Sequence, residues 1–143
     1  MTTVPELAPH TQAVSDLLTA AEVLHDIGVK PAGGGWQGTP EQSPFHWYAV
    51  VHPLEGTTDG PVADPDADVV RRVQVTVVGI TSDQAERGAD RVRAALVGAR
   101  PTVAGRSTEP VGIDQLSQVR PDDTAGPRVF ITTDVFTVAS TPA

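Results

Sequence analysis

The chain has 143 residues, a length typical of a single domain that buries about two-thirds of the surface exposed by its unfolded chain. Its 18 acidic residues outnumber its 10 basic residues, and the resulting formal net charge of -8 disfavours nonspecific binding to the phosphate backbone of nucleic acids. The sequence contains no cysteine, which excludes disulfides, thiolate metal sites and cysteine nucleophiles.

The composition also predicts a thin hydrophobic core in a soluble protein. Aromatic residues make up 4% of the chain, and 13 glycines and 13 prolines occupy many other positions, so the core depends mainly on Val, Leu, Ile and Ala. No apolar run approaches the roughly 18 residues of a membrane-spanning helix, and the N-terminal residues lack the basic and apolar segments of a signal peptide. We therefore expect a soluble protein that is made and kept in a cytoplasm.

The first predicted element is an amphipathic helix from Thr11 to about Asp26. Apolar residues recur there at the spacing of one helix face: Val14, Leu17, Leu18, Ala21 and Leu24. Gly28 follows at a point where a glycine can end a helix in the left-handed conformation.

Residues 31–44 are predicted to form a glycine- and proline-rich arm, because neither a helix nor a sheet accommodates this composition. The stretch from Gly33 to Gly38 formally matches the dinucleotide-binding pattern G-x-G-x-x-G. That pattern binds a pyrophosphate when a strand precedes it and a helix follows it, whereas here a helix precedes and a strand follows. An arm is therefore the favoured interpretation.

Two strands are predicted next, from Phe45 to Pro53 and from about Val69 to Ile80. Both are apolar on more than one side, which indicates that both faces of the sheet are buried against other parts of the protein or against a partner. The stretch between them, from Glu55 to Asp68, is predicted to be a long hairpin loop with a projecting tip. Loops of that length in compact domains usually carry a function or contact a partner.

A second helix is predicted from Ser82 to about Val97, capped by Thr81 or Ser82 and ended by Gly98. Weaker strands follow around residues 102–106 and 112–119, and a clear final strand spans residues 128–139. This order of elements favours an α+β fold with a mixed, mostly antiparallel β-sheet and two main helices packed on one face. All 143 residues are expected to form one domain.

No cofactor, metal ion or catalytic residue is expected from the remaining motifs. Asp64, Asp66 and Asp68 resemble the start of a calcium-binding loop, but Val69 stands where that loop needs glycine and Val75 where it needs glutamate. The histidines are too widely spaced along the predicted elements to share a metal: His10, His25, His46 and His52. No G-x-S-x-G, HExxH or Walker pattern occurs, so we expect that the chain is not an enzyme.

The two tryptophans favour different interpretations. Trp47 belongs to an apolar strand and is interpreted as a core residue. Trp36 belongs to the glycine-rich arm, from which a large side chain does not easily reach its own core. Aromatic residues are favoured anchors at protein interfaces, so we predict that Trp36 contacts another subunit.

Three stretches of the chain carry a resemblance to a known family. They read GGGWQGTPEQSPFHWYAVVHPLEGTTDG, VQVTVVGITSDQAERGADRVRAALVG and RVFITTDVFTVAST. Together they resemble the tail-terminator proteins of long-tailed, siphovirus-type bacteriophages, over roughly residues 33–139. The most specific part is the passage from strand to helix, VQVTVVGITSDQAERGADRVRAAL.

The resemblance implies an α+β virion structural protein that forms a ring, typically of six copies, on the finished tail tube. Such a ring stops tube elongation and presents the surface that joins the head. The implied partners are copies of this chain, the tail-tube protein and the head-completion or connector protein, with no membrane. Genomic DNA would pass through the lumen without specific binding. The implied location is the head-proximal end of the virion tail, after assembly in the host cytoplasm.

The resemblance transfers no catalytic residues and does not fix which side chains form the ring, so candidates come from the residues themselves. The subunit-interface candidates are aromatic: Trp36, Phe45, Trp47 and Tyr48. The candidates for the lumen or for a partner-facing loop are acidic: Asp59, Asp64, Asp66 and Asp68. Carboxylates in the lumen would keep passing DNA from adhering.

Two other classes of protein stay open. A head-tail connector or tail-tube subunit from the same kind of virion is also small, mixed in secondary structure and ring-forming, but tube subunits polymerise without limit. A soluble small-ligand-binding domain or a small enzyme would instead act as a monomer or a dimer.

Overall fold

The computed structural model describes residues 4–34, 46–124 and 128–143. In chain order its elements are α1 (Ala8–Ala20), β1 (His25–Ile27), β2 (Trp47–Asp59), β3 (Asp68–Gly79), α2 (Ser82–Leu96), β4 (Arg106–Thr108), β5 (Gly112–Gln115), β6 (Arg120–Asp122) and β7 (Val129–Pro142). The predicted α+β class is confirmed. Neither helix has the length and apolar character needed to cross a membrane.

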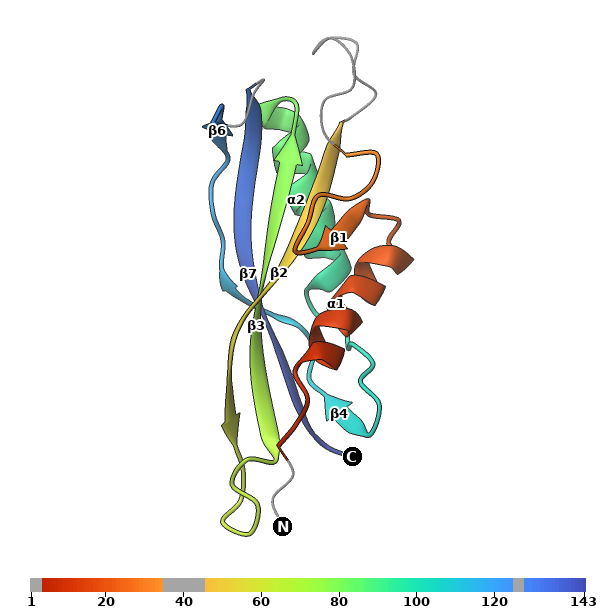
Figure 1. The fold of residues 1–143 in the computed structure, drawn as a ribbon, viewed down its shortest axis with the longest axis vertical. Coiled ribbons are helices and arrows are strands. Elements are labelled where there is room, and N and C mark those ends of the chain that lie inside the picture. Colours follow the sequence, from red (N-terminus) through yellow and green to blue (C-terminus); the bar gives the residue numbers. More distant parts are fainter. Residues whose placement is uncertain (1–3, 35–45, 125–127) are drawn as a thin grey trace.

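The seven strands form one sheet in the order β1-β2-β3-β7-β4, and β5 and β6 also pair with β7. β1 runs parallel to β2, and the other pairs are antiparallel. Three long strands, β2, β3 and β7, therefore make the centre of the sheet (Figure 1). The short strands β4, β5 and β6 lie one after another along the outer edge of β7, while β1 borders β2 at the opposite edge.

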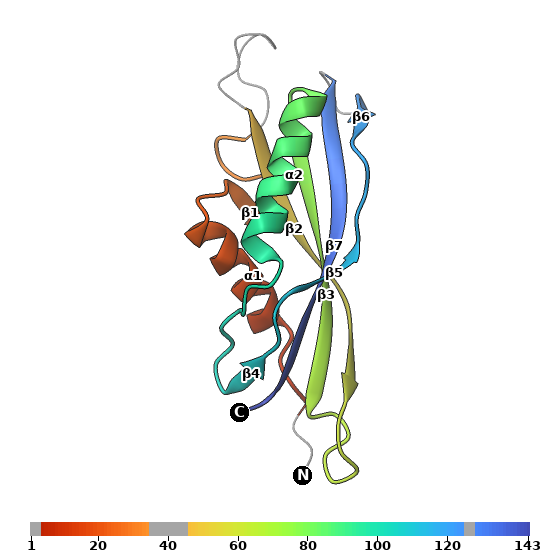
Figure 2. The same ribbon diagram turned by 180° about the vertical axis from the view of Figure 1, so that it is seen from behind.

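Both helices pack on the same face of the sheet, as predicted. α2 contacts β2, β3 and β7 and stands in front of them when the molecule is viewed from behind (Figure 2), and α1 lies beside α2 against β1 and β2. The core between these layers consists mainly of valine, with few large side chains: Val14, Leu18, Val51, Val73, Val75, Val77, Val92, Leu96, Phe136 and Val138. The described residues place no helix on the other face, which we call the open face.

The first helix differs from the prediction at both ends, because it spans Ala8–Ala20 and is ended by Glu22 rather than by Gly28. Glu22 has a left-handed backbone, with φ of 59°. Its N–H donates to the Thr19 carbonyl, and the Val23 N–H donates to the Leu18 carbonyl. These two bonds form a Schellman cap and turn the chain into β1, a three-residue strand that the sequence analysis missed.

The hairpin between β2 and β3 has a shorter loop than predicted. β2 continues past the expected strand end at Pro53 to Asp59, where it pairs with Asp68, so only residues 60–67 form the loop. The residues after Pro53 have low strand propensity, but β3 offers them a ladder of backbone partners that outweighs this preference. A register shift between Pro53 and Gly56 marks a bulge in β2.

The predicted second helix is confirmed, with bounds Ser82–Leu96 and a capping box in which Thr81 accepts from the Gln84 N–H. The weaker strands lie elsewhere than expected. The strand expected over residues 102–106 is β4 at Arg106–Thr108. Of the strand expected over 112–119, only the first half forms, as β5 at Gly112–Gln115, and β6 at Arg120–Asp122 was not predicted. The final strand is confirmed and extends to Pro142.

Candidate assembly surface

The open face of the sheet is built from one alternating set of residues on each long strand. Rows run across the strands as Tyr48–Val78–Ile131, Val50–Thr76–Thr133 and His52–Gln74–Val135. Most of these side chains are half-buried, and Val50 and Val135 are buried. The mixture of apolar and hydrogen-bonding side chains is typical of a sheet surface that can lie against either protein or water.

An ion-pair cluster centred on Arg72 lies on the same face. The Arg72 guanidinium pairs with Glu55 in the bulge of β2 and with Asp114 of β5, at 2.9 Å from its Nη2 to Asp114 Oδ2. Hydrogen bonds from its own backbone N–H and from Arg72 lower the pKa of Glu55, and the bond to Glu55 raises the pKa of Arg72. The cluster joins the β2 bulge to the β5 edge across the sheet.

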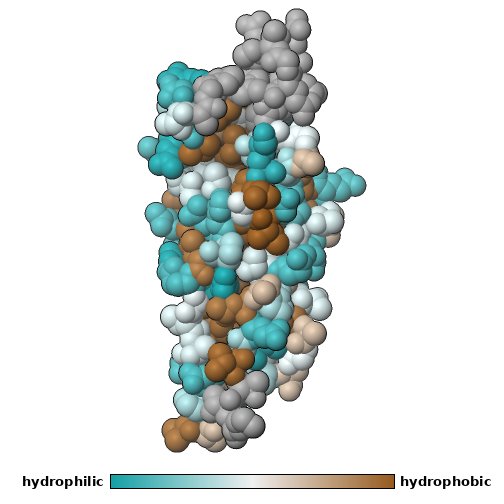
Figure 3. Space-filling model, in the orientation of Figure 1, coloured by the Kyte–Doolittle hydropathy of each residue, from teal (hydrophilic) through white to brown (hydrophobic). Residues whose placement is uncertain are grey.

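The two edges of the sheet each carry exposed apolar side chains, and the two sets differ. At the β1 edge, Leu24 and Val29 are 45% and 58% exposed. At the β5 edge, Ile113 and Leu116 are 46% and 51% exposed. Apolar residues also gather in separate patches, with polar residues between them, on the face turned to the viewer in Figure 3. The molecule therefore offers two distinct apolar edges on opposite sides of one sheet.

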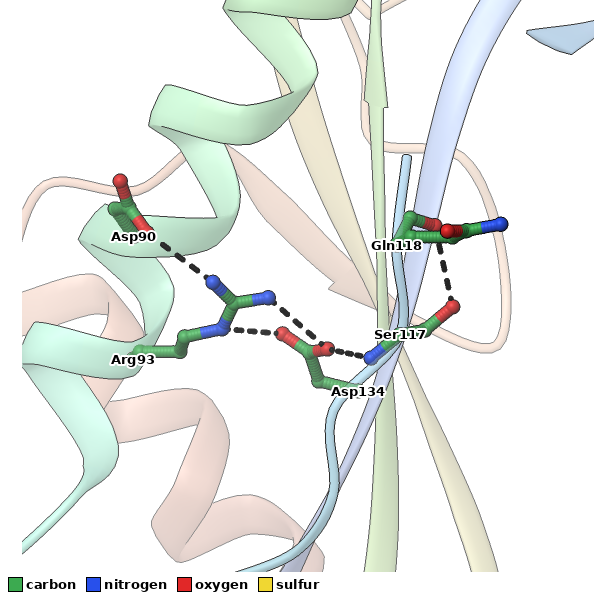
Figure 4. A network of polar contacts seen from close by, with 5 residues as sticks. All are labelled: Asp90, Arg93, Ser117, Gln118 and Asp134. Carbon is green, nitrogen blue, oxygen red and sulfur yellow. Dashed lines mark hydrogen bonds and ion pairs between the residues drawn. The ribbon is translucent and has the colours of Figure 1, made fainter. Parts of the chain in front are cut away.

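A buried ion pair holds residues 116–118, the edge segment between β5 and β6, against the sheet (Figure 4). Asp134 of β7, 2% exposed, accepts two bonds from Arg93 of α2, at 2.8 and 3.2 Å. Its Oδ1 also accepts from the Ser117 N–H at 3.0 Å, which fixes the residue next to Leu116. Arg93 reaches Asp90 as well, and the bond to Asp134 raises the pKa of Arg93.

Two of the four histidines, His10 and His25, have structural roles. The His10 Nδ1–H donates to the Glu6 carbonyl at 2.8 Å, so Nε2 is the acceptor for the Ser140 hydroxyl at 2.7 Å. Arg106 in turn donates to Ser140 Oγ at 2.7 Å. His25 bonds the Val23 carbonyl and the Ser15 hydroxyl. Within the described ranges, no group of three or more His, Asp or Glu side chains is arranged to hold a metal ion.

Two of the aromatic interface candidates lie within the described residues. Trp47 is half-buried against the core and packs on Gly88 of α2, where an added Cβ would lie 2.7 Å from its ring. Tyr48 is half-buried on the open face beside Gly34, and this burial raises the pKa of its hydroxyl. Trp36 and Phe45 lie outside the described residues. The assignment of all four to a subunit interface stays a prediction.

The four aspartate candidates lie together at the hairpin end. Asp59 and Asp68 pair across the last positions of β2 and β3, and Asp66 accepts from the Thr58 hydroxyl at 2.7 Å. The Asp64 carbonyl accepts from the Ala67 N–H within the loop. The hairpin extends beyond the helical layer at one end of the molecule (Figure 1), which gives these carboxylates a common location. Their role at a lumen or a partner stays a prediction.

Sequence reasoning missed the buried pair and both histidine networks. Asp134 and Thr132 belong to the face of the last strand that also carries Phe136, and both are buried beneath α2 and the edge segment. An acidic residue in the middle of an apolar strand is the signal that could have indicated a buried partner, because an isolated buried charge is strongly unfavourable. Its partner Arg93 is 41 residues away in the sequence and has no local signature.

No protein-family model matches the chain, and no curated protein matches it in sequence. Its fold, an α+β sheet with two helices on one face, does occur in solved structures. One is a chain from the virion of a native gene transfer agent particle, with a TM-score of 0.62, 14% identity, and coverage of 91% of this chain and 93% of that chain. Another, a protein designated only by a number, has a TM-score of 0.51, 19% identity, and coverage of 95% and 93%. Identities this low establish a likeness of fold alone.

Proposed function

We propose that this chain is a virion structural protein that assembles as a closed ring, six copies by the family resemblance, on the end of a tail tube. There it stops tube elongation and provides the surface that joins the head. The observation that carries the proposal is the pair of different apolar edges on one sheet, Leu24 and Val29 at one and Ile113 and Leu116 at the other. The fold likeness to a chain of a gene transfer agent virion supports it.

Two different edges favour a ring over a two-fold dimer. When one patch on a subunit meets a different patch on the next, the contact is heterologous, and a suitable rotation closes the series into a ring. The valine-rich core of this chain is thin, so burial of exposed edges between copies would add substantially to its stability. The open face, through Tyr48, and the arm at residues 31–44 with the adjoining Phe45, through Trp36 and Phe45, offer further area for the same contacts. Trp47 lies on the other face of β2 and would contribute only through the part of its side chain that the core leaves exposed.

The acidic hairpin suits a position facing the lumen or a partner. Asp59, Asp64, Asp66 and Asp68 concentrate negative charge at one end of the molecule, in a protein whose net charge is already -8. Repulsion between these carboxylates and phosphate groups would let DNA pass without binding. The other partners in the proposal are the tail-tube protein on one ring face and the head-completion protein on the other.

Electron microscopy of the purified protein, alone and mixed with a polymerising tail-tube protein, tests the proposal. Tail termination requires short rings and tubes whose growth stops when the protein is added. Long tubes formed by this protein alone would identify it as a tube subunit instead. Particles that stay monomeric and leave tube growth unchanged would favour the soluble-domain alternative and contradict the virion role.

Deletion of residues 31–43 tests the part assigned to the arm. If Trp36 contacts the adjacent copy, the shortened protein should form rings only at higher concentration than the full chain. Ring formation at an unchanged concentration would exclude Trp36 from the interface while leaving the ring itself intact.

A further inference from the structure

A hollow of about 330 Å³ lies between the start of α1, the strand β1 and the bulge of β2. Its lining is largely apolar, and Arg71 is its one charged residue: Ala8, Thr11, Gln12, Ile27, Pro53 and Arg71. The hollow is at the β1 edge of the sheet, the same edge that carries Leu24 and Val29. It therefore adjoins one of the two edges assigned to subunit contact.

Two polar groups that line the hollow have no partner. The Nε of Arg71 and the Oγ1 of Thr11 are buried and form no hydrogen bond, and the whole of Thr11 is only 4% exposed. No ion pair joins Arg71 to any described residue, in contrast to Arg72 and Arg93, which each bind two carboxylates. Buried donors without acceptors are unfavourable, so this site favours an acceptor from outside the subunit.

The helix that borders the hollow also favours an anion. α1 has no side-chain cap at its N-terminus and no acidic residue in its first turn. Its N-terminal partial positive charge is therefore not compensated from within the helix. Together with the Arg71 guanidinium, this makes the hollow a cationic site with apolar walls, suited to a carboxylate on a short aliphatic stem.

Glu109 has the chemistry and the position to supply that carboxylate from a neighbouring copy. It is exposed, between β4 and β5 at the opposite edge of the sheet. Its N–H donates to the Ala139 carbonyl, and Val138, the residue before Ala139, pairs with Arg71. Glu109 and Arg71 thus lie at nearly the same height along the strands. A ring whose axis runs parallel to the strands would therefore bring Glu109 of one copy to the height of Arg71 in the next.

We propose that the hollow at Arg71 binds the carboxylate of Glu109 from the adjacent copy of the chain. This inference rests on the proposed ring and names one contact that closes it. The carboxylate accepts from the guanidinium and from Thr11, while its methylene groups lie against Ile27 and Pro53. Each subunit gives one carboxylate and receives one, as a heterologous interface requires.

Charge reversal tests the pairing. Sedimentation velocity over a dilution series at low salt follows the assembly of four proteins: wild type, Arg71→Glu, Glu109→Arg and the double variant. Each single variant should raise the concentration needed for assembly at least about tenfold, and the double variant should recover most of this loss. Arg87→Glu, which makes the same charge change as Arg71→Glu on an exposed pair of α2, should assemble like wild type.

Circular dichroism melting separates loss of fold from loss of contact, and Arg71→Gln serves as a milder variant if Arg71→Glu does not fold. Single variants that fold and assemble like wild type would overturn the proposed contact without affecting the ring. A double variant no better than the single variants would overturn the pairing with Glu109. Failure of the wild-type protein to assemble, alone or on tubes, would overturn the proposed function itself.

Discussion

Glu22 ends α1 in a backbone conformation that glycine adopts more readily. Its φ of 59° places a side chain in the left-handed region, which costs about 1–2 kcal/mol for an L-residue with a Cβ. The two Schellman bonds and the burial of Val23, which is 5% exposed, offset this cost. The Glu22 position is therefore a local weakness that one substitution relieves.

Glu22→Gly should raise the free energy of unfolding by about 0.5–1 kcal/mol, because glycine removes the Cβ strain but makes the unfolded chain more flexible. Urea denaturation measures the change. Ala94→Gly, at an exposed position in the last turn of α2, is the control and should lower the free energy of unfolding by about 0.5–1 kcal/mol. A destabilised Glu22→Gly variant would contradict the role of Glu22 in the cap.

His10 makes the stability of the fold depend on pH. Burial lowers the pKa of His10 from its usual 6.5, and the nearby charges of Arg106 and Arg71 lower it further, against the bond to the Glu6 carbonyl, which raises it. Between the lowered pKa and about pH 6.5, the unfolded chain binds a proton that the folded chain does not. The His10 contribution to the free energy of unfolding is therefore complete above pH 6.5 and is lost as the pH falls through this window.

The free energy of unfolding should fall more between pH 7.5 and pH 5.5 for the wild type than for His10→Gln. The variant should be less stable at pH 7.5, because it loses the bonds to Glu6 and Ser140. The other histidines are common to both proteins, so their titration cancels in the comparison. Equal pH slopes in the two proteins would exclude His10 as a source of the dependence.

The ion pair between α2 and β7 decides how the edge segment is held. Arg93 is 24% exposed and Asp134 is 2% exposed, so removal of the arginine leaves a buried carboxylate with only the Ser117 N–H as partner. A buried pair broken on one side typically loses about 3–5 kcal/mol. Because Ser117 precedes β6 and follows Leu116, the loss should also loosen the β5 edge.

Arg93→Met should therefore lower the free energy of unfolding by about 3 kcal/mol. Arg87→Met, which breaks the exposed pair with Asp83 on the same helix, is the matched control and should change it by less than about 0.5 kcal/mol. Amide hydrogen exchange at residues 116–118 should also rise in Arg93→Met. A stability equal to that of the control would mean that Asp134 finds another partner.

The sequence predicted those elements whose pattern is long and regular. Alternating valines indicated β3, and the capping residues with a clear apolar stripe indicated α2 almost to the residue. Three-residue strands such as β1 and β6 carry no period, and β2 extends past Pro53 because of its partner strand rather than its own composition. These features depend on tertiary pairing, which local patterns do not contain.

The candidate surface could be predicted only in part. Tyr48 and Trp47 were selected as aromatic residues, and the structure assigns them to opposite faces of β2, with Trp47 against α2. The exposed pair Ile113 and Leu116 was not selected, because exposure of an isolated apolar residue is decided by the chain packed around it. The hollow at Arg71 could not be predicted from the sequence for a similar reason, because its lining comes from four separate segments of the chain.

Across the whole molecule, the two apolar edges are the surfaces that the proposed assembly would bury. Leu116→Asp places a charge at the β5 edge, at a side chain that is already 51% exposed, so the monomer should lose little stability. Its assembly should require at least about tenfold more protein, because a charge would be buried at the contact. Ala94→Asp, on the exposed side of α2, should assemble like wild type. Unchanged assembly of Leu116→Asp would remove this edge from the interface.

Native mass spectrometry across a dilution series, with the protein alone and after release from capped tubes, tests the ring most directly. A closed ring should appear as one oligomer with a fixed number of 14.9 kDa subunits, six by the resemblance, and no series of longer species. A chain that stays monomeric at every concentration, and that is absent from the tube ends, would contradict it.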